Sequence, residues 1–352
     1  MFCKQKTQEN RPVEESVSMN TTANVGSNFR SCRSSLICQE ALKIEHMVAF
    51  SLILVVSLVG NSLVVLIVYK TPALKKPINM LIANMAMSDL LFPTFLFPLR
   101  LAEVHVGSWI IGGALGQALC KLHVFLANTS MLVSIQSLVL IAVDRFGAVV
   151  VPLRSPLITR KLCPFFIIAT WIVAMAFHSP DIVAFKLVKY PERLMCKDLW
   201  QEAFGGSMYP NYLLAGVTVF VYIPFVLLVI LYSIILIKLK KQAHPGEKSA
   251  TAEGKRTRRN RNVFKMTVAI VVVFFICYIP CLSIMIILGF SAPDSPIFSS
   301  CSFYPYALVT LFMAYANCAI NPIICLTFSS NYRQGVKRLV RCCAADAVEH
   351  YV

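Results

Sequence analysis

The chain has 352 residues, of which 57% are hydrophobic and only 14% charged, whereas an ordinary soluble domain has about 25% charged residues. The apolar residues gather in blocks too long for the elements of a soluble core, so the composition excludes a soluble enzyme and indicates a protein embedded in lipid. The formal charge of +16 does not indicate a nucleic acid partner here, because the basic residues lie in short stretches between apolar blocks, where anionic lipid and the bias of membrane insertion explain them.

Seven apolar stretches follow one another along the chain, and each is near or above the roughly 20 residues that a helix needs to cross about 30 Å of hydrocarbon. They cover residues 46–69, 77–101, 120–148, 163–184, 209–237, 264–289 and 303–327. Helices are expected because lipid offers no hydrogen bonds to an unpaired backbone. The sequence therefore predicts an all-α membrane protein, with a bundle of seven transmembrane helices over residues 46–327.

The distribution of Lys and Arg predicts the orientation of this bundle. If the amino end is outside, the inner segments hold 21 of the 33 Lys and Arg residues, and the outer loops hold six. The positive-inside bias therefore predicts a multi-pass membrane protein whose tail over residues 1–45 lies outside. This tail contains a glycosylation acceptor at Asn20. It contains no apolar run that resembles a cleaved signal, so the first span is expected to direct targeting.

Residues 328–352 are predicted to form a short amphipathic helix and a cytoplasmic tail. Apolar residues repeat at helical spacing over 328–340, with basic residues beside them, which suits a helix that lies on the lipid of the inner leaflet. Cys342 and Cys343 follow this helix and are candidate palmitoylation sites.

Four polar residues lie inside the predicted spans, where an unpartnered polar group is costly and each one is a functional hypothesis. Asp89 lies in the second span, Asn61 in the first, and Asn317 and Asn321 in the seventh. Pro322 follows Asn321 and removes one backbone hydrogen bond from that helix. The four residues could converge on one polar pocket; the alternative is an inert network that only satisfies its own hydrogen bonds.

These residues stand in motifs that resemble those of the rhodopsin-like G-protein-coupled receptors, over about residues 46 to 343. In chain order the motifs are Gly60-Asn61-Ser62-Leu63-Val64, residues 81–91 with Asp89, Asp144-Arg145-Phe146, Trp171, Pro224 with Tyr232, Phe274 with Cys277-Tyr278-Ile279-Pro280, and Asn321-Pro322-Ile323-Ile324-Cys325. One motif per span, in the family's order, is specific. The resemblance implies a non-enzymatic receptor that binds an extracellular ligand and activates a heterotrimeric G protein by helix rearrangement. Arrestin and a receptor kinase would be further partners.

The family's outer disulfide is expected between Cys120 and Cys196. Cys120 precedes Arg145 by 25 residues, about 37 Å of helix, so Cys120 lies at the outer mouth when Arg145 reaches the inner one. Cys196 lies in the outer loop after the fourth span, in an oxidising compartment. Cys301 is a candidate for a second outer disulfide with Cys38, although Cys32 competes as partner and could instead pair with Cys38.

The resemblance also implies a coupling switch, whose members would be Asp144, Arg145, Tyr232, Asn321 and Pro322. Asp144 would hold Arg145 at rest, and Arg145 would move towards Tyr232 when the helices separate. The alternative is that Arg145 has no switch function and only extends its side chain from the membrane interface into water.

A connector between pocket and switch would consist of Ile135, Pro224, Phe274 and Tyr278, although such apolar residues are equally consistent with simple core packing. Tyr278 stands where the family has a tryptophan, and Cys325 replaces the tyrosine of the seventh-span motif. The second change leaves open a receptor that does not signal through G protein.

An allosteric sodium site is the one cofactor site that the resemblance implies, and no other metal or cofactor is expected. Its ligands would be Asp89, Ser134, Asn317 and Asn321.

The ligand is predicted by exclusion and by charge. Ala127 stands where amine receptors carry an aspartate, and Tyr315 where opsins carry a lysine, so an amine or retinal is disfavoured. The remaining pocket would be lined by Phe97, Glu103, Asn128, Met131, His178, Tyr278, Met285, Leu311 and Tyr315. The loop over it carries charges of both signs, which suits a neuropeptide and is similar to the peptide-receptor branch. A small non-peptide ligand is the alternative; a transporter is disfavoured because Asp89 alone cannot form a relay.

Overall fold

The computed structural model describes residues 47–151, 156–191, 193–205, 208–242, 252–291 and 303–349. Asn20, Cys38 and Cys301 lie outside the described residues. The helical backbone is described at Phe97, Glu103, Cys342 and Cys343, but their side chains are not.

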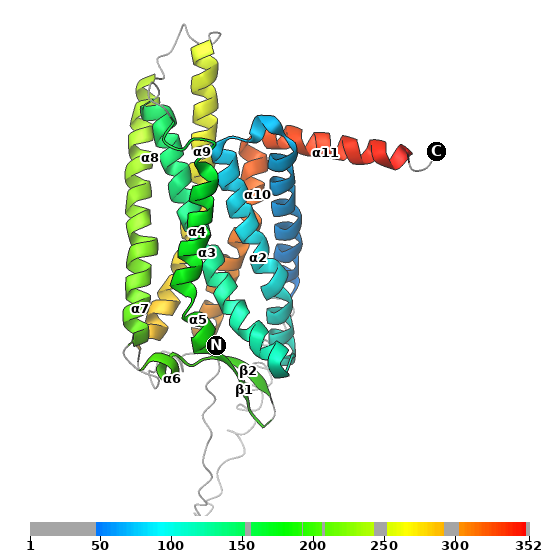
Figure 1. Ribbon diagram of the computed structural model, residues 1–352, viewed down its shortest axis with the longest axis vertical. Coiled ribbons are helices and arrows are strands. Elements are labelled where there is room, and N and C mark those ends of the chain that lie inside the picture. Colours follow the sequence, from blue (N-terminus) through cyan, green and yellow to red (C-terminus); the bar gives the residue numbers. More distant parts are fainter. Residues whose placement is uncertain are drawn as a thin grey trace, which may run out of the picture.

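In the described part of the chain, seven long helical segments run side by side in one bundle (Figure 1). They are the helix Met47–Lys70, α2 (Pro77–Val106), α3 (Gly113–Val150), α4 (Cys163–His178), α7 (Met208–Val217) with its continuation, α9 (Ala252–Phe290) and α10 (Phe303–Phe328). Six of these segments are long and apolar enough to cross a membrane by composition, and the 30 residues of α2 span about 45 Å. The predicted seven-helix bundle is therefore confirmed.

The fifth membrane segment contains a wider turn. After α7 the chain passes through η2, a π-helix over Thr218–Tyr222, and then continues as α8 (Ile223–Gln242). Pro224 is the second residue of α8 and offers no backbone N–H, so a regular α-helical hydrogen bond cannot form at that position.

One end of the bundle carries the β-hairpin, and we call it the hairpin end. Here α4 is followed by α5 (Asp181–Ala184), β1 (Phe185–Lys189), β2 (Leu194–Asp198) and α6 (Trp200–Phe204). The strands are antiparallel and pair Leu187 with Cys196. Cys196 is joined to Cys120 on α3 by a disulfide with a Cα–Cα distance of 5.5 Å, which confirms that prediction. The sequence reasoning expected a loop here and missed the hairpin.

The opposite end carries the short η1 (Pro72–Leu74) and α11 (Ser330–Glu349), and we call it the α11 end. Helix α11 points sideways away from the bundle after α10 (Figure 1) and is longer than the predicted 328–340. Tyr332 is buried, and its hydroxyl donates to Asn79 at 3.4 Å. A Cβ on Gly335 would lie 2.4 Å from Ile67, so only glycine lets α11 approach the first helix this closely.

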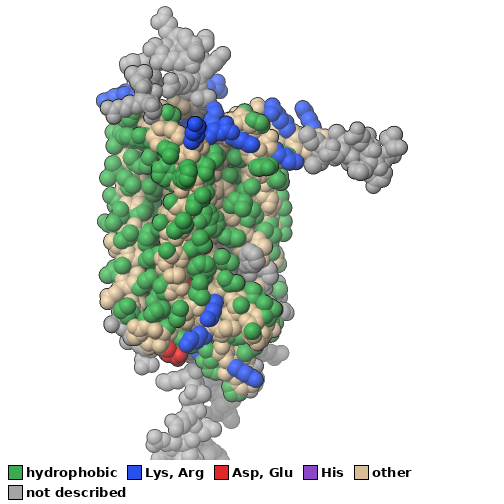
Figure 2. All heavy atoms as spheres, viewed as in Figure 1, with side chains coloured by type: hydrophobic (Ala, Val, Ile, Leu, Met, Phe, Trp, Pro, Cys, Tyr) green, Lys and Arg blue, Asp and Glu red, His purple; other side chains and the backbone are tan. Residues whose placement is uncertain are grey.

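The surface separates by chemistry along the bundle. Apolar side chains cover its middle on the face shown, and Lys and Arg gather at the α11 end (Figure 2). Large apolar side chains such as Val55, Ile168 and Ile276 are more than half exposed. Such an apolar belt is unfavourable in water and fits a surrounding bilayer.

Candidate functional site

The centre of the bundle contains a buried carboxylate that three helices share. Asp89 on α2 is 1% exposed and accepts hydrogen bonds from Asn321 Nδ2 on α10 at 2.9 Å and from Ser134 Oγ on α3 at 3.4 Å. Both side-chain atoms of Asn317, one turn earlier on α10, and Oδ1 of Asn321 are buried without a hydrogen-bond partner among the described residues. The structure thus brings together Asp89, Ser134 and Asn321 of the predicted sodium ligands and places Asn317 one turn away on α10, with amide oxygens of both asparagines still able to accept a cation or water.

Asn61 links the first helix to α10. Its Nδ2 donates to the carbonyl of Cys318 on α10 at 2.8 Å and to Ser57 Oγ at 3.1 Å. Residue 318 is four positions before Pro322, which has no N–H to offer that carbonyl. Asn61 therefore satisfies the carbonyl that Pro322 leaves free, and these contacts link the first helix to α10.

Gly60 lets the first helix come close enough for this contact. A Cβ at Gly60 would lie 2.6 Å from Pro322 Cγ, so Gly60→Ala should force the two helices apart. Overpacking of this kind lowers the free energy of unfolding by about 1–3 kcal/mol. We therefore expect the purified Gly60→Ala variant to have a clearly lower apparent melting temperature than the unmodified protein. Gly112→Ala is the matched control, because its Cβ would meet only Leu194 at 3.6 Å. Equal melting temperatures for the two variants would contradict this explanation.

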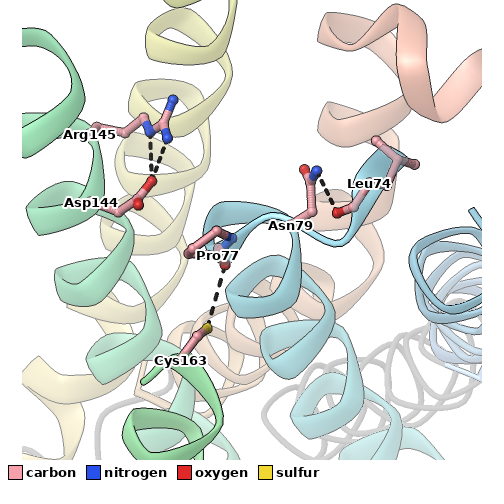
Figure 3. Close-up of polar contacts among 6 residues, drawn as sticks. All are labelled: Leu74, Pro77, Asn79, Asp144, Arg145 and Cys163. Carbon is pink, nitrogen blue, oxygen red and sulfur yellow. Dashed lines mark hydrogen bonds and ion pairs between the residues drawn. The ribbon is translucent and has the colours of Figure 1, made fainter. Parts of the chain in front are cut away.

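The α11 end contains the predicted switch residues in a paired arrangement. Arg145 Nε donates to Asp144 Oδ2 at 3.0 Å, and a second guanidinium nitrogen contacts the same oxygen. Figure 3 shows this pair at the end of α3, near a turn fixed by the donation of Asn79 Nδ2 to Leu74 O at 2.9 Å. The hydroxyl of Tyr232 on α8 is buried without a hydrogen-bond partner among the described residues. The structure brings Asp144 and Arg145 together and leaves Tyr232 outside the pair.

Three of the four predicted connector residues lie within the largest apolar cluster of the bundle. Ile135 and Phe274 are almost completely buried there, and the rings of Phe274 and Tyr278 lie 4.5 Å apart. Pro224 on α8 is partly buried and is not a member of this cluster. Because dense packing transmits small displacements, this cluster is suited to link the two ends of the bundle.

The hairpin end contains a buried carboxylate, which the sequence alone shows only as one of the charges of the outer loop. Asp181 is 3% exposed, and its Oδ2 accepts a hydrogen bond from Asn128 Nδ2 on α3 at 2.9 Å. The same oxygen lies 3.2 Å from Nδ1 of His178 at the end of α4. Within the described residues Asp181 pairs with no Lys or Arg. A buried carboxylate without a permanent cation favours a cationic ligand group.

The remaining predicted pocket residues divide between two environments. Met131 and Tyr278 contact the main cluster, whereas Leu311 and Tyr315 belong to a second cluster that includes Ala127. The Tyr315 ring lies 5.3 Å from that of Phe50 on the first helix. These side chains supply apolar walls rather than charge. Met285 is partly buried on α9.

A second carboxylate lies close to Asp181 but outside the membrane segments. Asp198 at the end of β2 accepts a hydrogen bond from the backbone N–H of Trp200 at 3.0 Å. Burial raises the pKa of Asp198 from 3.8 to about 6, and the negative charge of Asp181 adds to the effect. A carboxyl whose pKa is raised by folding favours the folded state when protonated, and this stabilisation is lost as the pH rises through about 6.

Asp198→Asn should therefore raise the apparent melting temperature near neutral pH and change it little near pH 4. The difference between the two pKa values of Asp198 corresponds to a change of at most about 3 kcal/mol in the free energy of unfolding. Asparagine retains an oxygen that can accept the hydrogen bond from the Trp200 N–H. Thermal unfolding of the purified protein between about pH 4 and 7.5 measures the effect. Glu202→Gln is the control, because Glu202 is exposed on α6. A stability profile of Asp198→Asn that still falls like that of the unmodified protein would refute this assignment.

Comparison with known proteins agrees with this architecture. Residues 60–324 match the model of the family described as 7 transmembrane receptor (rhodopsin family). The chain is 29% identical over 308 residues to Neuropeptide FF receptor 1 of Rattus norvegicus, covering 83% of this chain and 69% of that receptor. It is 28% identical over 296 residues to the RYamide receptor of Drosophila melanogaster (82% of this chain, 61% of that receptor). It is 30% identical over 296 residues to the Allatostatin-A receptor of Bombyx mori (83% and 78%). The chain therefore belongs to the rhodopsin family of seven-transmembrane receptors.

Proposed function

We propose that this receptor binds an extracellular neuropeptide at the hairpin end and activates a heterotrimeric G protein at the α11 end. The observation that carries the proposal is the buried carboxylate of Asp181, held by Asn128 and His178 beneath the hairpin. It offers a site for a basic group of a peptide. The relatives' names, which include Neuropeptide FF receptor and RYamide receptor, support the same class of ligand.

The orientation belongs to the proposal. The α11 end faces the cytoplasm and the amino terminus faces outward across the plasma membrane, since Lys and Arg gather at the α11 end (Figure 2). The disulfide between Cys120 and Cys196 at the hairpin end fits an oxidising exterior. In this orientation Asn20 would carry glycan outside, and Cys38 and Cys301 would form the second disulfide. Cys342 and Cys343 would carry palmitate inside, where α11 meets lipid and where arrestin and a receptor kinase would bind.

The hairpin holds the roof of the proposed site in place. The Leu187 N–H donates to Gln117 Oε1 at 2.9 Å, the Leu194 N–H to Ser108 Oγ at 3.0 Å, and the Trp109 N–H to Leu194 O at 2.8 Å. Together with the disulfide these bonds tie both strands to the outer end of α3 and to the loop that precedes it. A fixed roof lowers the conformational entropy that a peptide loses on binding.

Ligand binding would be transmitted through Tyr278, Phe274 and Ile135 to the pair of Asp144 and Arg145. Helix separation would free Arg145 to reach Tyr232, and Asn321 with Pro322 lets α10 adjust because the backbone there is missing one hydrogen bond. A sodium ion bound by Asp89, Ser134, Asn317 and Asn321 would supply a positive charge that favours the resting arrangement. Cys325 supplies no hydroxyl for Tyr232, so Arg145 carries more of the active-state contact.

The test combines a receptor variant with a ligand variant. The receptor is expressed with a G protein, nucleotide exchange is measured against a panel of basic neuropeptides, and Asp181→Asn is compared with the unmodified chain. Loss of a charge-assisted hydrogen bond costs about 1.5–3 kcal/mol, so we expect Asp181→Asn to weaken the activating peptide roughly tenfold to a hundredfold. Glu103→Ala, the change favoured by the sequence alone, would test the other acid in the same assay.

The matched control is a peptide in which the basic residue is replaced by citrulline, which keeps the shape and removes the charge. That peptide should be weaker on the unmodified receptor and equally weak on Asp181→Asn, because the charge no longer has its partner. Equal losses from the citrulline substitution on both receptors would place the basic residue elsewhere. Full activation by a biogenic amine, with none by any peptide, would refute the peptide proposal itself.

A further inference from the structure

A groove of about 630 Å³ runs along the lipid-facing side of the bundle between α8 and α9. Val229 and Leu236 form one wall, and Val272 and Ile276 form the other. Val229, Val272 and Ile276 are each about half exposed, so the groove opens sideways into the surrounding bilayer. Its volume falls within the roughly 300–1,000 Å³ of ligand pockets, and its lining is almost entirely hydrocarbon.

Aromatic side chains keep the two helices apart and form the floor of this groove. The rings of Phe225 and Phe275 lie 4.5 Å apart, and those of Tyr232 and Phe264 lie 5.9 Å apart, each pair joining α8 to α9. All four residues line the groove. A linear hydrocarbon chain can lie along such a slot, whereas water would find almost no hydrogen-bond partners there.

Three cations continue the two walls at the α11 end. Lys240 follows Leu236 by four residues on α8, and Arg261 and Lys265 precede Val268 and Val272 by seven residues on α9. Residues four or seven apart share a helix face, and all three cations are exposed. Residues 223–242 and 260–290 contain no Asp or Glu, so neither helix supplies a carboxylate for these cations along those stretches.

We propose that this groove binds one acyl chain of an anionic phospholipid from the cytoplasmic leaflet, with Lys240, Arg261 and Lys265 at its headgroup. The apolar slot selects a chain, and the positive mouth selects an anionic headgroup over a zwitterionic one. The placement in the cytoplasmic leaflet rests on the orientation proposed above. Lipid binding itself depends on neither the peptide nor the G protein, so it can fail or succeed independently of the proposed function.

The test uses the full chain in nanodiscs of phosphatidylcholine that contain phosphatidylserine with a photoreactive diazirine on one acyl chain. After illumination, peptide mapping locates the label, which we expect on α8 and α9. Val272→Trp should fill the slot and remove most of this label. Val219→Trp is the matched control, because Val219 and Val272 are both 49% exposed and Val219 lies outside the groove.

The headgroup is tested by a triple variant, Lys240→Gln, Arg261→Gln and Lys265→Gln. It should lower the labelling by phosphatidylserine, relative to phosphatidylcholine with the same diazirine chain, roughly tenfold to a hundredfold. The control triple Lys76→Gln, Arg160→Gln and Lys161→Gln removes the same types of exposed cation elsewhere at the α11 end and should keep the preference. Label spread evenly over all lipid-facing helices, or equal labelling by the two lipids in the unmodified chain, would overturn the proposal.

Discussion

Arg145→Ala should lower peptide-stimulated nucleotide exchange roughly tenfold to a hundredfold while peptide binding and surface expression stay largely intact, since couplings between distant sites are typically about 1–3 kcal/mol. At rest Arg145 donates to the neighbouring Asp144, and the side chains of Arg145 and Asp144 are only 15% and 9% exposed. Surface expression, measured alongside nucleotide exchange, therefore separates a loss of coupling from a loss of folding. Exchange on purified G protein, measured at saturating peptide, reports the loss of coupling directly.

The complementary variant is Asp144→Asn, which keeps the shape of the side chain and removes its charge. It should raise exchange in the absence of peptide, because Arg145 is then released towards Tyr232 at no cost in ion pairing. Arg160→Ala serves as the control, since Arg160 is an exposed cation at the same end of the bundle. Normal exchange in Arg145→Ala would show that the switch is assigned to the wrong residue.

The sequence predicted the helices well because lipid imposes a length and an apolar composition on every span. The third and sixth apolar stretches begin at 120 and 264, whereas the helices α3 and α9 begin earlier, at Gly113 and Ala252. The hydrophobic pattern records only the part of a helix that crosses hydrocarbon. Polar turns that continue into water satisfy the same backbone hydrogen bonds without any apolar signal.

The polar sites were predictable only in part. Asp89, Ser134 and Asn321 meet as the family resemblance implied, because each stands in a motif with a fixed place in its helix. Asp181 and the hairpin carry no such motif, so the sequence showed a charged loop and nothing of its folded shape. A usable signal was present nonetheless: Asp181 follows His178 by three residues across Pro180, a spacing that brings the two side chains together in a helical turn.

Sodium should lower the affinity of the receptor for an activating peptide, and Asp89→Asn should abolish this effect. The Asp89 carboxylate is fully enclosed, and the hydrogen-bond donors that it meets among the described residues, including Asn321 and Ser134, are neutral, so a cation stabilises the charge of Asp89 strongly. An ion that binds the resting arrangement more tightly shifts the population away from the state that binds peptide. Peptide binding to membranes, measured with sodium chloride and with choline chloride at the same ionic strength, isolates the effect from charge screening.

Ser88→Ala distinguishes the loss of ion binding from a general disturbance of the packing around Asp89. Ser88 is equally buried, and its hydroxyl contacts Ser134 Oγ at 3.1 Å and Met85 O at 2.8 Å but makes no hydrogen bond to Asp89. It should keep most of the sodium effect, whereas Asn317→Leu, which removes two buried atoms without partners among the described residues, should weaken it. Affinities that respond to sodium equally in the unmodified receptor and in Asp89→Asn would exclude Asp89 as the ion's ligand, because the remaining polar groups of this layer are neutral and cannot replace the charge of a carboxylate.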